Sequence, residues 1–79
     1  MANKIVKLTF PQKLIKEPVI FNMAKKYDVM PNIRRAKITE EIGEVVLDLE
    51  GEQKNLDQGI EYLTKAGVNV EPIVGDIIE

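Results

Sequence analysis

The spacing of apolar residues switches repeatedly between two periods along this chain, and the order of the switches is what most limits its fold. Residues 4–10 carry apolar side chains at alternate positions, Val6, Leu8 and Phe10, which predicts a half-buried strand. Pro11 ends this strand because proline has no N–H to donate to a neighbouring strand. A polar stretch with Lys13 and Lys16 follows. A helix is then predicted from Pro18, with one apolar face made of Ile20, Met23, Ala24 and Tyr27.

The middle of the chain returns to the period of two and predicts a hairpin. Residues 32–39 and 44–50 form its strands, and residues 40–43 form the turn, where Gly43 can adopt a positive φ. In the first strand we expect Arg34, Ala36 and Ile38 to share one face, with Ile33, Arg35 and Lys37 on the other. In the second strand we expect Val45, Leu47 and Leu49 to point inwards. Arg35 and Lys37 are expected to pair with acidic residues of the second strand.

The last third of the chain predicts one more helix and one more strand. The helix covers about residues 52–66, with an apolar stripe of Leu56, Ile60 and Leu63. Gly59 lies beside this stripe, which predicts close approach to the sheet, and Gly67 predicts a left-handed helix end. Residues 68–74 predict the final strand, and Pro72 predicts an edge position for part of it. In the tail, Ile77 and Ile78 are expected to be exposed.

The order of elements is therefore βαββαβ, which predicts an α+β fold. Right-handed crossovers place both helices on one face of a four-stranded antiparallel sheet. This arrangement is the ferredoxin-like two-layer sandwich. We expect residues 1–79 to form a single domain, because a chain of this length can build only one core.

Composition removes several classes of chemistry. The chain has no cysteine and no histidine, so disulfides and the metal sites built on those residues are excluded, and no cofactor is expected. The net charge of −2 argues against attraction to nucleic acid, and no apolar run is long enough for membrane insertion. The outward positions of the central strands carry no aromatic residue on which RNA bases could stack. We therefore expect a cytoplasmic protein with no catalytic residue, and a homodimer because a small core stabilises weakly.

Residues 29–34, Val-Met-Pro-Asn-Ile-Arg, precede an alternating strand, the glycine turn at Gly43 and a second strand. This pattern resembles the NIL domain, a family named after an Asn-Ile-Leu triplet at the start of its second strand. Asn32 and Ile33 match the triplet, and Arg34 replaces the leucine. The opening strand, the first helix start, the late-helix leucine and the closing residues 67–71 also sit where the family has comparable residues.

The resemblance implies a regulatory function that depends on binding. NIL domains occur at the C-terminus of methionine-importing ABC transporter ATPases, where they resemble ACT domains, pair as dimers and bind methionine. They also occur fused to ferredoxin-type iron–sulfur modules. This chain contains neither the ATPase nor the cluster cysteines, so it resembles a free-standing copy of the regulatory part.

Carried over by position, the ligand contacts would centre on Asn32 and Ile33, with Met30 nearby. An amide offers donors and an acceptor together, which suits the ammonium and carboxylate of an amino acid. Asn32 could instead be a turn residue, Ile33 an outward sheet residue or dimer contact, and Met30 a filler of a hydrophobic gap. Arg34 is expected on the helix side, where it would reach the rim or pair with a carboxylate. It could adapt the site to an anionic ligand or mark the loss of methionine binding.

Two functions remain open from the sequence. The first is a non-catalytic regulatory domain that senses methionine or a related sulfur amino acid. The second is a protein-interaction module for an iron–sulfur or ABC-transporter partner, with no small ligand. Such a module would expose an apolar patch, for instance at Ile77 and Ile78 or at Ile5, Val46 and Ile73.

Overall fold

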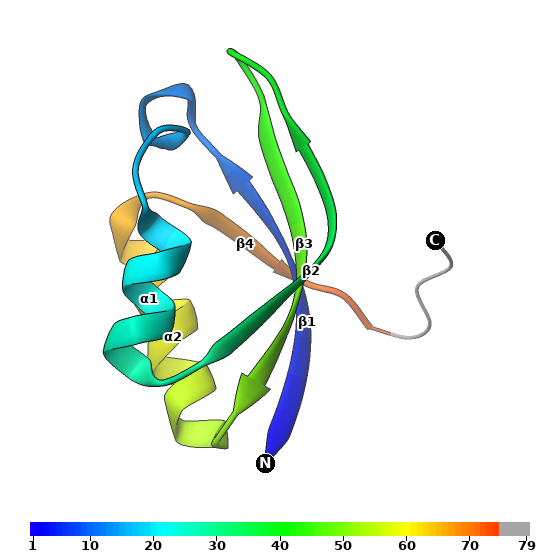
Figure 1. The fold of residues 1–79 in the computed structure, drawn as a ribbon, viewed down its shortest axis with the longest axis vertical. Coiled ribbons are helices and arrows are strands. Elements are labelled where there is room, and N and C mark those ends of the chain that lie inside the picture. The colour runs from blue at the N-terminus through cyan, green and yellow to red at the C-terminus, as the bar shows by residue number, and fades with distance from the viewer. Residues whose placement is uncertain (75–79) are drawn as a thin grey trace.

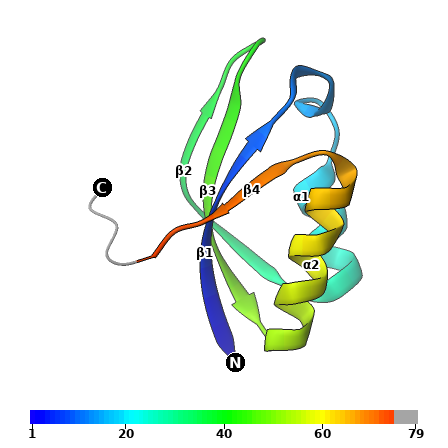
Figure 2. The ribbon, with the colours of Figure 1, turned by 180° about the vertical axis from the view of Figure 1, so that it is seen from behind.

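Two helices lie on one face of a four-stranded antiparallel sheet in the computed structural model, which describes residues 1–74 (Figure 1). The elements in chain order are β1 (Ala2–Phe10), a 3-10 helix η1 (Gln12–Leu14), α1 (Val19–Tyr27), β2 (Met30–Ile38), β3 (Gly43–Gly51), α2 (Gln53–Ala66) and β4 (Asn69–Pro72). The strand order across the sheet is β2-β3-β1-β4. The predicted βαββαβ order and ferredoxin-like fold are confirmed, and Figure 2 shows both helices on the same side from behind.

The two central strands are paired along their full length, whereas the edge strands differ in extent. β1 pairs with β3 from Ala2 opposite Gly51 to Phe10 opposite Gly43. β4 pairs with only the second half of β1 and is an edge strand, which is where Pro72 predicted it. The N–H of Ile73 still donates to the carbonyl oxygen of Ile5 beyond Pro72. The predicted strand 68–74 is therefore too long at both ends. The predicted tail residues Ile77 and Ile78 lie outside the described residues.

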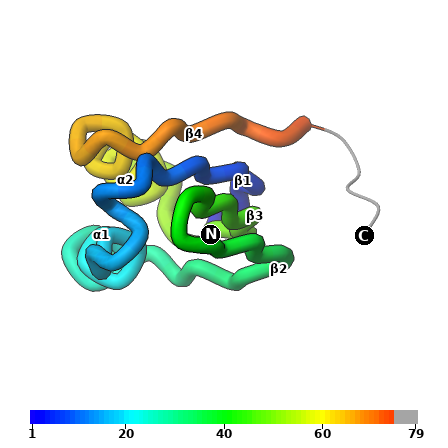
Figure 3. Tube along the Cα trace, turned by 90° about the horizontal axis from the view of Figure 1, so that it is seen from above, coloured from blue at the N-terminus to red at the C-terminus, as the bar shows by residue number. Residues whose placement is uncertain are grey.

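The core lies between the sheet and the helices, which form two separate layers (Figure 3). Residues of β3 alternate strictly between buried and partly exposed, so the period of two identified its inward side chains correctly. The buried apolar residues are Val6, Leu8, Phe10, Val19, Met23, Val29, Val45, Leu47, Leu49, Leu56, Leu63 and Val68. No described helix is long and apolar enough to cross a bilayer.

Gly59 permits close packing, but against the neighbouring helix. A β-carbon placed there would lie 2.8 Å from Sδ of Met23 in α1 and 3.7 Å from Cγ2 of Val29. The prediction that the sheet approaches Gly59 is therefore wrong. The element that approaches it is α1, because α1 and α2 pack side by side above the strands. A missing side chain on α2 lets the long Met23 side chain fill the space between the helices.

The segment between β1 and α1 contains a short helix and contributes apolar contacts to the core, although its sequence is mostly polar. Residues Gln12–Leu14 form the turn of 3-10 helix, and Leu14 and Ile15 pack against the core. In the sequence this segment stands out only for the lysines that flank them, Lys13 and Lys16. A pair of apolar residues inside a short polar segment has no periodicity to read, so this contact was not predicted.

β2 contains an irregularity that changes which side chains face which side of the sheet. Its pairing with β3 shifts register between Ile33 and Arg35, so Arg34 is the extra residue of a β-bulge. Ile33 pairs with the buried Leu47 and therefore points to the helix side, whereas Arg34 reaches Asp48 on the opposite, open face. The predicted orientations of Ile33 and Arg34 are both wrong, because one inserted residue reverses the alternation.

Replacing Gly67 by alanine should lower the free energy of unfolding by about 1–2 kcal/mol, since an L-residue resists the left-handed region. Gly67 has φ 107° and ends α2, where its N–H donates to the carbonyl oxygens of Leu63 and Thr64. Urea-induced unfolding followed by circular dichroism measures the change, with Lys54→Ala on the exposed side of α2 as control. Equal midpoints for the two variants would contradict the expected strain.

Candidate site on the open face of the sheet

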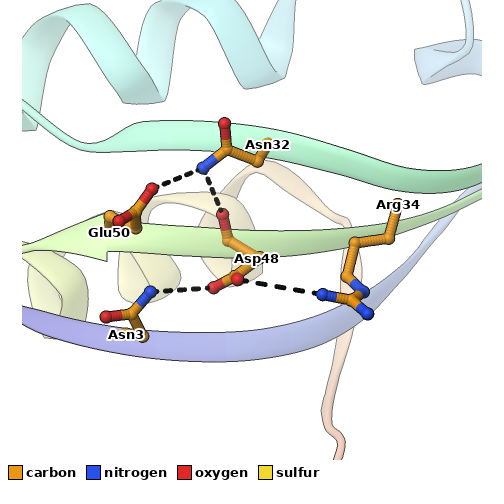
Figure 4. Close-up of polar contacts among 5 residues, drawn as sticks. All are labelled: Asn3, Asn32, Arg34, Asp48 and Glu50. Atoms are coloured by element: carbon orange, nitrogen blue, oxygen red, sulfur yellow. Dashed lines mark hydrogen bonds and ion pairs between the residues drawn. The ribbon is translucent and has the colours of Figure 1, made fainter.

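A cluster of polar side chains occupies the face of the sheet that the helices leave open (Figure 4). The side-chain amide nitrogen Nδ2 of Asn32 donates to Oε2 of Glu50 at 2.7 Å and lies 3.4 Å from the backbone oxygen of Asp48. Oδ1 of Asp48 accepts from Nδ2 of Asn3 at 3.3 Å. Its second oxygen, Oδ2, lies 4.0 Å from Nη1 of Arg34. The cluster thus joins three neighbouring strands, β2, β3 and β1.

The strand register explains why these residues meet. Asn32 lies opposite Asp48, and Asn3 lies opposite Glu50. Directly opposed residues in antiparallel strands point to the same side, so all four side chains reach the open face. The bulge then turns Arg34 to this side as well, where it can approach Asp48. Without the bulge, alternation would send the arginine to the helix side.

The cluster offers complementary groups for a small zwitterion. It contains two carboxylates, one guanidinium and two amides, so it presents acceptors for an ammonium group and donors for a carboxylate. Oδ1 of Asn32 accepts no hydrogen bond from any residue in the described part of the chain, which leaves it open to a ligand donor. Within residues 1–74 no acidic cluster is placed to hold a metal ion.

A shallow hollow lies beside this cluster on the same face. Val46 of β3 lines this hollow. Val46 is two residues from Asp48, which lies opposite Asn32, so the hollow adjoins the cluster. Its volume is about 640 Å³, which lies in the range of small-molecule sites. Its lining consists of Lys7, Arg35, Ala36, Lys37, Glu44, Val46 and Ile73. Nζ of Lys7 lies 3.7 Å from Oε2 of Glu44, whereas the predicted pairs of Arg35 and Lys37 with acids do not form within residues 1–74.

The structure brings together only part of the predicted site. Asn32 belongs to the polar cluster, and Met30 lies opposite Glu50 at the start of β2, on the same side and 60% exposed. Met30 therefore fills no gap in the core. Ile33 points to the other side of the sheet, away from the cluster around Asn32.

Sequence reasoning missed the acidic partners of Asn32. The acidic residues of the second strand were expected to pair with Arg35 and Lys37, whereas Asp48 and Glu50 contribute to the cluster around Asn32. Their alternation with Leu47 and Leu49 placed them on the open face correctly. Identifying them as partners of Asn32 required the exact register of the two strands, which a single-residue bulge changes.

Comparisons with known proteins agree with the fold and with one family. The model of the NIL domain family matches residues 4–72. Methionine import ATP-binding protein MetN 2 of Acinetobacter baylyi is 38% identical over 72 residues, which cover 86% of this chain and 21% of that protein. The corresponding MetN protein of Streptococcus mutans is 34% identical over 70 residues, 84% of this chain and 20% of its own. The chain thus spans about a fifth of the length of these relatives.

A solved structure shows the same architecture. The C-terminal domain of an ABC transporter ATP-binding protein from Enterococcus faecalis superposes with a TM-score of 0.81 and 31% sequence identity. The match covers 92% of this chain and 86% of that one. The shared region therefore includes nearly the whole sheet and both helices, together with the strands that carry the polar cluster.

Proposed function

Because the chain belongs to the NIL domain family, we propose that it is a non-catalytic regulatory domain that binds a small amino-acid ligand on its open face. Methionine is the first candidate, since the relatives are named as methionine import proteins. A related sulfur amino acid such as homocysteine is the second. A cytoplasmic location belongs to the same proposal, because the relatives are named as ATP-binding proteins.

The polar cluster around Asn32 is the observation that carries this proposal. The short hydrogen bond from Asn32 to Glu50 fixes the amide, and its free oxygen can accept from a ligand ammonium group. Arg34 lies close enough to share its guanidinium between Asp48 and a ligand carboxylate. The neighbouring hollow, with Val46 and Ile73 among its lining residues, has apolar surface for the ligand side chain.

A homodimer would complete this site, and we include it in the proposal. In one chain the cluster is exposed, so water competes for every hydrogen bond. A second copy packed over the open face would exclude water and strengthen these contacts. On the open face, β2 carries Arg35 and Lys37, and the neighbouring β3 carries Glu44 and Asp48. A two-fold rotation can therefore bring opposite charges together across the interface.

Replacing Asn32 by alanine should weaken methionine binding roughly tenfold, the usual effect of losing one hydrogen bond to a charged group. Isothermal titration with methionine and with homocysteine measures the affinity of the parent chain and the variant. Asn69→Ala is a matched control, because Asn69 also donates to a carboxylate, Glu71, but on β4. Equal affinity in the parent and Asn32→Ala would remove Asn32 from the site.

Sedimentation equilibrium with and without methionine tests the dimer in the same samples. We expect the dimer to be favoured by the ligand, because a ligand that binds between two copies stabilises their association. Absence of heat with both amino acids would remove the amino-acid function. The chain would then be better described as a protein-interaction module for a transporter or iron–sulfur partner.

That second function has an observation of its own in its favour. Large apolar side chains are exposed on the helix side of the sheet edge, with Phe21 64%, Ile33 68% and Ile38 60% exposed. Such a patch was predicted at Ile5, Val46 and Ile73, but these three are only partly exposed. The difference arises because β2 is an edge strand whose helix side is incompletely covered.

A further inference from the structure

The free edge of β2 combines exposed backbone with an uneven distribution of charge. Pro31 alone among its nine residues is partly covered, and the rest are exposed. The edge strand therefore offers unpaired N–H and C=O groups to another strand. All its charged residues are basic, and neither Arg35 nor Lys37 forms an ion pair with a residue in the described range 1–74.

An apolar groove lies on the helix side next to the same part of β2. Its volume is about 130 Å³, close to that of cavities that take up a benzene-sized group. Its lining includes Ile38 of β2, Phe21 of α1, Phe10, Val19 and Val45. Glu17 is its one charged lining residue. A strand added to the edge of β2 could place an apolar side chain in this groove.

We propose that residues 35–38 of β2 bind an extended segment of a partner protein in which acidic residues alternate with apolar ones. Acidic side chains of the added strand would face Arg35 and Lys37 on the open face, and apolar side chains would face Ala36, Ile38 and the groove. The bulge at Arg34 limits regular pairing to this half of the edge. This contact uses the free edge of the sheet, although Arg35 and Lys37 also line the hollow beside the cluster around Asn32.

The strand that already pairs with β2 supports this choice of partner. β3 carries Glu44 and Asp48 on the open face and Val45 and Leu47 on the helix side, which is the proposed alternation. A second copy of β2 is a poor occupant of the edge. Antiparallel pairing of two β2 strands would bring the basic side chains of both copies together, and like charges on facing strands are destabilising.

A labelled peptide with the sequence of residues 43–51 is a direct probe of this edge. Fluorescence anisotropy should show binding to the chain. A peptide with Glu44→Lys, Asp48→Lys and Glu50→Lys should bind at least about tenfold more weakly, because the complementary charges are lost. Amide NMR spectra should show the largest peptide-induced changes at residues 35–38. Equal binding of the two peptides, or changes confined to β4, would overturn the proposal.

Two variants of the chain separate the apolar and charged contributions. Phe21→Ser and Lys37→Glu should each weaken binding of the 43–51 peptide at least about fivefold, since each removes one half of the recognition pattern. Lys54→Glu, an equal charge change on α2, should leave it within about twofold. Both test positions are exposed, so the fold is retained. Unchanged peptide affinity in Phe21→Ser and Lys37→Glu would place the peptide elsewhere.

Discussion

Replacing Leu47 by alanine is expected to lower the free energy of unfolding by about 2–5 kcal/mol, the usual cost of truncating a fully buried leucine. Leu47 is 0% exposed and lies in β3, between Val6 of β1 and Ile33 of β2. Few atoms can move into the space that the side chain leaves, because paired strands flank it on both sides. Small domains have total stabilities of only about 5–15 kcal/mol, so a loss at the upper end would leave much of the chain unfolded.

Urea-induced unfolding followed by circular dichroism measures this loss. Val46→Ala provides the control, since Val46 belongs to the same strand but points to the open face and is only partly buried. It should cost clearly less than Leu47→Ala. Similar losses in both variants would show that the two faces of β3 are equally packed, against the alternation seen in the structure. Leu47→Ala should also weaken any ligand binding, because Asp48 is held by the same strand.

The core and the order of elements followed from periodicity because burial imposes it directly. A strand packed on one face must alternate, and β3 does so from Gly43 to Gly51. Helix α2 must present one apolar stripe, and Leu56 and Leu63 are buried as predicted. Gly67 adopts the left-handed conformation that its position suggested. Each of these features depends on neighbouring residues within one element, so the sequence alone is enough to predict it.

The orientation of β2 could not be predicted in the same way. β2 uses one residue more than the stretch of β3 with which it pairs, so one residue has to bulge. Neither glycine nor proline marks the position at Arg34, and the mismatch arises from the fixed ends of both strands. A helix end at Asp28 with φ 54° and the turn closed by the hydrogen bond from the Thr39 N–H to the Ile42 carbonyl oxygen together set those ends. Gly43 itself is the first residue of β3 and does not adopt the positive φ expected of it. Register is a property of two strands, and alternation within one strand leaves it open.

The candidate site was also predictable only in part, because some of its features depend on one strand and others on the pairing of two. The family resemblance pointed to Asn32, and its side chain lies in the polar cluster on the open face. Its partners Asp48 and Glu50 followed only from the register, and Ile33 was placed on the wrong side for the same reason. Local pattern thus identifies candidate residues, whereas the pairing of strands decides which of them meet.

Replacing Gly59 by leucine is expected to lower the free energy of unfolding by about 1–3 kcal/mol, because extra atoms in a filled core force side chains from their preferred rotamers. The first added carbon would already lie 2.8 Å from Sδ and 3.3 Å from Cγ of Met23. Leucine favours the helix over glycine by roughly 1 kcal/mol, which offsets part of this cost. The steric term should win, since Met23 is fully buried and has little room to move.

A double-mutant cycle with Met23→Ala identifies the cause of that loss. Met23→Ala alone should cost about 2–5 kcal/mol, because it leaves a cavity between the helices. In that background Gly59→Leu should cost little or should stabilise, as leucine fills the cavity and retains its helix preference. Gln58→Leu, one position away on the exposed side of α2, controls for the effect of leucine itself. Equal losses from Gly59→Leu in both backgrounds would show that Met23 does not set the limit on residue size here. The distance between α1 and α2 would then depend on the backbone of α2 or on Val29, the other neighbour of Gly59.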